Sequence, residues 1–113
     1  MAISDVYSQT LSTLTAARTA MLSTDWQASL ATQNDPAVSL EASQQLVEIQ
    51  KAITELSNSA LADIATQMSA QQDTLQSATK DLAAALQNIK NVQNVITTVT
   101  SILNTVSQIV PLI

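Results

Sequence analysis

The chain has 113 residues, a formal net charge of −5, and no Gly, Cys or His. Without His and Cys it lacks the commonest general base, the thiolate nucleophiles and the usual zinc ligands. We therefore expect no enzymatic activity, no cofactor and no metal site. A nucleic-acid surface is not expected either, because phosphate binding uses clustered Lys and Arg, and this acidic chain has 4 of them against 9 Asp and Glu.

The composition predicts an all-α fold. Tight turns and β-bulges use Gly for positive φ angles, and a chain with 0 Gly and only 2 Pro has few such positions. At this length we expect one helical domain over residues 1–113.

The N-terminal residues lack the basic segment and apolar run of a cleavable signal peptide. Cytoplasm is therefore the default expectation, and export without a cleavable leader is the alternative. Lipid anchoring is not expected, since position 2 is Ala and no Cys is available for prenylation.

The first predicted helix covers about residues 4–33. Ser4 can cap its N-terminus through the side-chain hydroxyl. Thr24 and Gln27 have the spacing of a capping box, so a kink near residue 24 is an open alternative. Trp26 is expected to pack at the end of this helix, with a role in a protein interface as the other possibility.

Two further helices are predicted over about residues 36–70 and 73–110. Asp35 and Pro36 mark the start of the second helix, as N-cap and first helical residue. Its apolar side chains then recur every three or four residues, at Leu46, Ile49, Ile53, Leu56, Ala60, Ile64 and Met68. This stripe fails at residues 69–73, which predicts that the chain folds back there.

These elements predict a helical hairpin or a three-helix bundle of long antiparallel helices, completed by oligomerisation. The alternative is one straight helix over residues 36–110. It would be about 110 Å long, which requires neighbouring copies to cover its apolar stripe, as in a coiled coil.

The last 23 residues, 91–113, contain no Lys, Arg, Asp or Glu. An apolar stripe repeats along them with helical spacing, and it includes Ile89, Val92, Ile96, Val99, Leu103, Val106 and Val110. The opposite side is polar but uncharged, and it predicts an association face of Asn94, Thr97, Thr98, Ser101, Asn104, Thr105 and Gln108.

Three interpretations of this segment compete. It is an interior helix of a bundle, a surface for another protein, or a membrane segment. A solvent-facing helix usually carries charge, and the uncharged side therefore favours a non-enzymatic protein that associates with itself or with another helical protein. The alternative function is a membrane-active or pore-forming component in which segment 91–113 inserts on assembly; as a lone span it would bury too many hydroxyl and amide groups.

Three glutamates, Glu41, Glu48 and Glu55, recur every seven residues on the second helix. Neighbouring members lie about 10.5 Å apart along the axis, too far to share a metal ion, and a solvated face is expected. No motif of a known family is present. Only the Gly-free composition, rich in Ala, Ser, Thr and Gln, is similar to that of bacterial secreted and filament-forming helical proteins.

Overall fold

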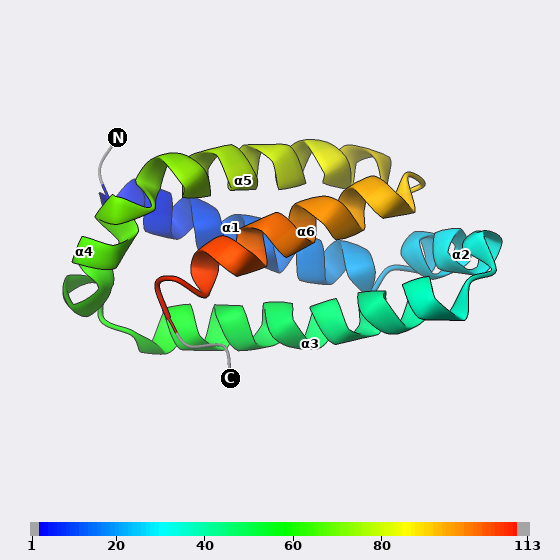
Figure 1. Cartoon of the computed structure of the whole chain (residues 1–113), viewed down its shortest axis with the longest axis horizontal. Helices are drawn as coiled ribbons and strands as arrows, with labels where there is room; N and C mark the ends of the chain where they lie inside the picture. Colours follow the sequence, from blue (N-terminus) through cyan, green and yellow to red (C-terminus); the bar gives the residue numbers. More distant parts are fainter. Residues whose placement is uncertain (1–2, 111–113) are drawn as a thin grey trace.

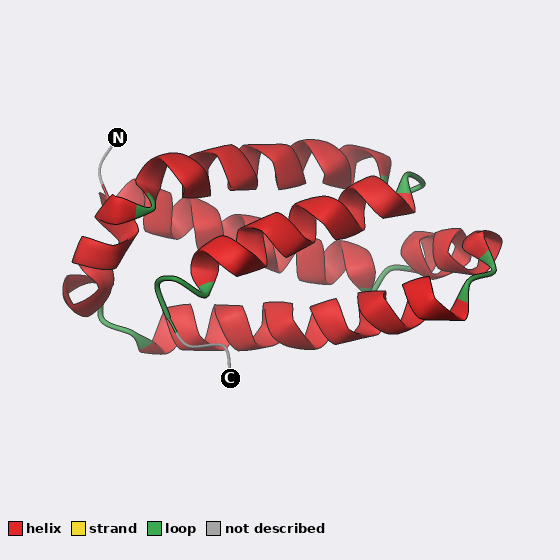
Figure 2. Cartoon of the chain, in the orientation of Figure 1, coloured by secondary structure: helices red, strands yellow, loops and turns green. Residues whose placement is uncertain are grey.

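The computed structural model describes residues 3–110, and every regular element in this range is a helix (Figure 2). The all-α prediction is confirmed. The elements in chain order are α1 (Ile3–Met21), α2 (Thr24–Gln33), α3 (Pro36–Asn58), α4 (Leu61–Ala70), α5 (Gln72–Ala85), the 3-10 helix η1 (Leu86–Asn88) and α6 (Val92–Val106).

Four of these helices, α1, α3, α5 and α6, run along the 44 Å length of the molecule and alternate in direction (Figure 1). α1 packs against α3 and α5, and α6 packs against the same two helices. α1 and α6 therefore lie diagonally opposite each other, with α6 in front in Figure 1. α4 packs against α1 and carries the chain from α3 to α5 across one end of the bundle, while α2 lies at the other end.

The first predicted helix, 4–33, is wrong as a single element, because the chain breaks at Leu22 and Ser23. The alternative, a kink near residue 24, is confirmed, but the cap is Ser23 and not the predicted Thr24. The Ser23 hydroxyl oxygen accepts a hydrogen bond from the Trp26 N–H at 3.2 Å. Ser4 is also not a cap, since α1 already includes it. The break turns α2 so that Trp26 reaches the core.

The start of the second helix is confirmed, but its predicted end at residue 70 is wrong. Asp35 caps α3 by accepting from the Ala37 N–H at 3.0 Å, with Pro36 in the first turn. α3 ends at Asn58, because Ser59 is extended and its hydroxyl donates to the Glu55 carbonyl at 2.8 Å. Ala60 is exposed and adds no large side chain to the stripe, so a turn here costs little apolar burial.

The predicted turn at 69–73 exists as the break between α4 and α5 at Gln71, but the predicted third helix, 73–110, is wrong. A second turn over residues 86–91 divides it into α5 and α6, and these two helices form the antiparallel hairpin. Asn91 caps α6 by accepting from the Asn94 N–H at 3.3 Å. Because of these breaks, four long helices form the bundle, not the predicted two or three, and oligomerisation stays a prediction.

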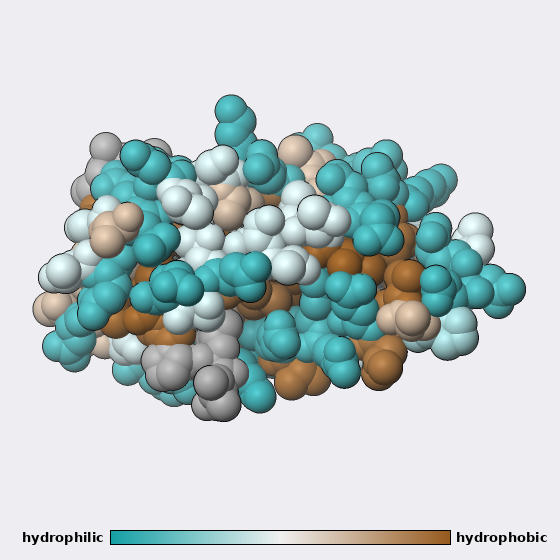
Figure 3. Space-filling view, in the orientation of Figure 1, coloured by the Kyte–Doolittle hydropathy of each residue, from teal (hydrophilic) through white to brown (hydrophobic). Residues whose placement is uncertain are grey.

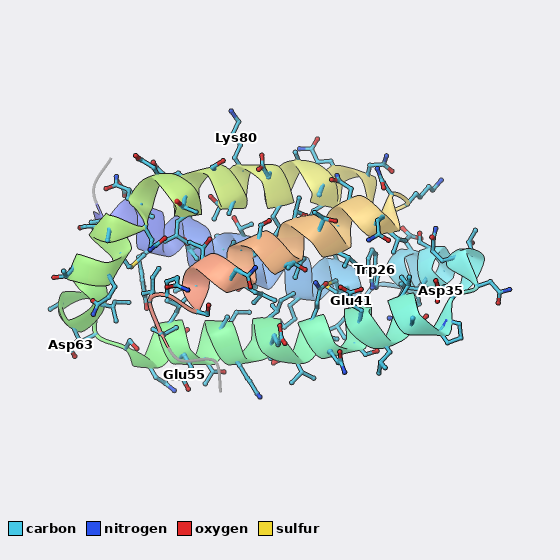
Figure 4. All side chains as sticks on the ribbon, in the orientation of Figure 1. Trp26, Asp35, Glu41, Glu55, Asp63 and Lys80 are labelled. Atoms are coloured by element: carbon cyan, nitrogen blue, oxygen red, sulfur yellow. The ribbon has the colours of Figure 1, made fainter. Side chains whose placement is uncertain are left out.

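One hydrophobic core takes side chains from all six α-helices of residues 3–110. α2 contributes only Trp26 and Leu30 to the buried set. Trp26 is 1% exposed and points into the bundle (Figure 4), so it is a core residue and does not form part of an exposed interface.

We expect Trp26→Ala to lower the free energy of unfolding by about 3–5 kcal/mol, the usual cost of deleting a buried aromatic side chain. Urea unfolding followed by circular dichroism measures this loss, and Trp26→Phe, which keeps a ring in the core, is the control with a clearly smaller loss. An alanine variant as stable as the wild type would show that α2 is not held by this side chain.

Candidate association surface

The position of α6 is set by its apolar side. Among the predicted stripe residues, the structure buries Val92, Ile96, Val99, Leu103, Val106 and Val110. Ile89 precedes the helix and is half-buried against the core. This side of α6 packs between α3 and α5, and the opposite side therefore faces outward.

Five of the seven predicted association residues are exposed, namely Asn94, Thr97, Ser101 and Asn104 of α6 and Gln108 in the turn that follows it, and we call this set the outer face of α6. The other two lie on the flank of α6. Thr98 is half-buried, and Thr105 is only 6% exposed, so the structure removes Thr105 from the predicted face. Thr105 lies beside α5, because it lines a groove with α5 side chains.

Most hydroxyl groups on this face and beside it bond to the helix that carries them. Thr98 donates to the Asn94 carbonyl at 2.9 Å, and Thr100 donates to the Ile96 carbonyl at 2.9 Å. Ser101 and Ser107 do the same toward carbonyls three or four residues earlier, at 3.3 and 2.6 Å. The surface thus has few free hydroxyl donors. Figure 3 also shows a pale area of intermediate hydropathy where α6 lies.

A surface groove of about 410 Å³ lies where α6 packs against α5, and it is lined by Asp73, Thr74, Ser77, Ala78, Asp81, Ser101 and Thr105. The two aspartates are exposed and belong to α5. The uncharged outer face therefore meets carboxylates along its α5 side.

On the other flank, Gln45 of α3 reaches α6. Its Nε2 donates to the Ile96 carbonyl at 3.0 Å and to the Thr100 hydroxyl oxygen at 2.7 Å. The residue is 5% exposed, and its Oε1 is buried without a hydrogen-bond partner. Sequence reasoning missed this contact, although Gln45 stands four residues before Ile49 and hence in line with the apolar stripe of α3.

The cleft between α2 and α3, of about 270 Å³, is lined by Trp26 and Met21 among others. Its polar groups are mostly engaged in bonds within the chain. Gln27 Nε2 donates to the Met21 carbonyl at 3.3 Å, and the Ser43 hydroxyl donates to the Ser39 carbonyl at 3.1 Å. This cleft thus offers few polar groups that could orient a ligand, and α6 presents the more distinctive surface.

Comparison with models of known protein families finds no match for this chain, and comparisons with curated proteins and with solved structures find none either. Within residues 3–110, no helix combines the length and apolar character that crossing a membrane requires. The same residues include no group of three or more acidic side chains placed to hold a metal ion. Function is therefore inferred from the chemistry of the surfaces.

We expect Gln45→Leu to change the free energy of unfolding by less than about 1 kcal/mol. It removes the unpartnered acceptor together with the donor, and replacing buried polar groups by an apolar group of similar shape is often nearly neutral. The Ile96 carbonyl keeps its bond from the Thr100 hydroxyl.

The matched variant Gln45→Glu places a carboxylate oxygen against that carbonyl and loses at least about 1–3 kcal/mol. Urea unfolding at neutral pH compares the two variants. Equal losses for both would contradict this account of the α3–α6 contact.

Proposed function

We propose that this is a non-enzymatic helical protein that acts through helix–helix association at the outer face of α6, with a second copy or with a partner protein. The observation that carries the proposal is the combination of an uncharged outer face with hydroxyl groups on it and beside it, at Ser101, Thr98 and Thr100, that bond to their own helix. No Lys, Arg, Asp or Glu occurs from residue 91 onward.

Low desolvation cost supports this proposal. Burying a polar group that loses its hydrogen bonds to water costs about 1–3 kcal/mol. The hydroxyls of Thr98, Thr100 and Ser101 keep their intrahelical bonds when a partner displaces water. The threonine methyl groups add apolar area to the same surface, and no charge has to leave water.

A low entropy cost of ordering the side chains of this face also supports the proposal. Ordering a long, flexible side chain at an interface costs about 0.5–1.5 kcal/mol, and Lys, Glu and Arg are among the most costly. The outer face of α6 is made mostly of short Ser, Thr and Asn side chains with few rotatable bonds. A partner can therefore pack closely on it while immobilising little.

Membrane insertion, the alternative function, has less support. The apolar stripe of α6 would have to leave the bundle to meet lipid, and most of its members are buried, with Val99 and Val106 at 0% exposure. Exposing a large aliphatic side chain to water costs about 1.5–3 kcal/mol. Association through the outer face needs no such opening.

Two Thr→Glu substitutions test the proposal. Thr97 lies on the outer face of α6, and Thr15 is an exposed residue of α1, the helix diagonally opposite. We expect each to change the free energy of unfolding by less than about 0.5 kcal/mol, as solvated positions do. Only Thr97→Glu should weaken association, because it places a charge in the contact.

Light scattering over a concentration series measures self-association, and titration with a labelled amphipathic helical peptide measures binding of a partner. Equal weakening by both substitutions, or no effect of Thr97→Glu on either kind of binding, would rule out the outer face of α6 as the association surface.

A further inference from the structure

We propose that the partner of the outer face is a basic helix of another protein, with uncharged residues in the contact and Lys or Arg on both flanks, and not a second copy of this chain. This inference rests on the proposed function and specifies its partner. It is carried by carboxylates on both sides of the outer face, which we call the acidic rim: Glu41, Glu48, Asp73 and Asp81.

Two members of the rim are on α3. Glu41 and Glu48 stand four residues before and three residues after Gln45, and residues with this spacing are neighbours on a helix surface. Gln45 bonds to α6 directly, so its neighbours lie on the same flank of α3. Both glutamates are exposed, and Glu41 lies on the edge of α3 that faces α6 (Figure 4).

The other two members are on α5. Asp73 and Asp81 line the groove that α5 shares with Ser101 and Thr105 of α6. Both are exposed. Carboxylates therefore run along both edges of the outer face. A helix lying on the outer face would bring its own flanking side chains within reach of these carboxylates.

The outer face itself carries no cation that could neutralise this rim. Within residues 3–110 no carboxylate forms an ion pair with Lys or Arg. Lys80 projects from α5 away from α6 and lines a groove shared with α1. Lys90 lines a cleft with α2, before α6 begins. Arg18 belongs to α1, diagonally opposite α6. Lys51 of α3 is exposed and stands three residues after Glu48 and six after Gln45, so it is the one cation whose spacing makes it a helix neighbour of a rim carboxylate.

The positions of these carboxylates favour a basic helix over a second copy of this chain as the partner. In a symmetric dimer the same surface meets itself, so in either orientation carboxylates of one copy would oppose carboxylates of the other. Like charges brought together suppress an association, and complementary charges speed encounter and set specificity. A helix with Lys or Arg on both flanks pairs with the rim and leaves its uncharged side against Thr97 and Ser101.

The test uses the full chain and two synthetic helical peptides of about 20 residues, long enough to span about 30 Å. One has an Ala and Thr face flanked by two columns of Lys, and the other has Glu at every Lys position. The rim variant is Glu41→Gln, Glu48→Gln and Asp81→Asn. Its matched control removes the same charge elsewhere, by Asp5→Asn, Asp25→Asn and Asp63→Asn.

We expect wild type and control to bind the Lys peptide and not the Glu peptide, measured by fluorescence anisotropy. The rim variant should lose about tenfold in affinity at about 0.1 M salt, as three exposed ion pairs predict, and the control less than about twofold. Near 1 M salt, where the Debye length falls from about 10 Å to about 3 Å, the difference between the variants should disappear.

Equal losses in the rim variant and the control, or no preference for the Lys peptide, would overturn the basic-helix partner. A dimer that Thr97→Glu abolishes and the rim variant strengthens would overturn it as well, while leaving the proposed association at α6 intact. If Thr97→Glu changes neither self-association nor binding of the Lys peptide, the proposed function fails, and the partner with it.

Discussion

The structure depends on the packing of α6 between α3 and α5. This helix has 4 Val, 2 Ile and 4 Thr among its 15 residues, and β-branched residues cost roughly 0.5 kcal/mol each relative to Ala in a helix. Its intrinsic helicity is therefore low, and burial of its apolar side must hold it. Val95, Val99 and Ile102 have no exposed surface at all. If this packing were lost, α5 and α3 would each expose a side that now belongs to the core.

The same packing determines which surface can meet a partner. Because the apolar side of α6 is used within the molecule, only the opposite side and its two flanks remain available. The α3 flank is joined to its neighbour by the hydrogen bonds of Gln45, and on the α5 flank Thr105 is buried beside the groove with its hydroxyl bonded to the Ser101 carbonyl of α6. The outer face is thus held in a rigid setting, and rigid, short side chains lose little entropy on binding. The uncharged outer face and the acidic rim beside it both follow from the packing of α6 between α3 and α5.

The helices of this bundle are joined by turns that contain no Gly. Asn34 takes the left-handed conformation at the end of α2, with φ 49°, a role that Asn tolerates better than most residues. Ser23, Asp35 and Asn91 cap the helices that follow them through side-chain oxygens. Asn, Asp and Ser can do this because their short side chains bond to nearby backbone groups. Polar residues at the breaks thereby replace the glycines that such a chain would otherwise need.

The sequence by itself determined the fold class, the start of α3 at Asp35 and Pro36, and the apolar side of the last helix. These follow from local rules: absent glycines, a cap followed by Pro, and a three-to-four residue period. The tertiary structure alone decided the breaks at Ser59 and at residues 86–91, because nothing local forbids a helix there and the gain comes from packing distant helices together. It also decided that Thr105 is buried and that Gln45 bonds to α6, since both depend on which neighbours α3 and α5 bring to the flanks of that helix.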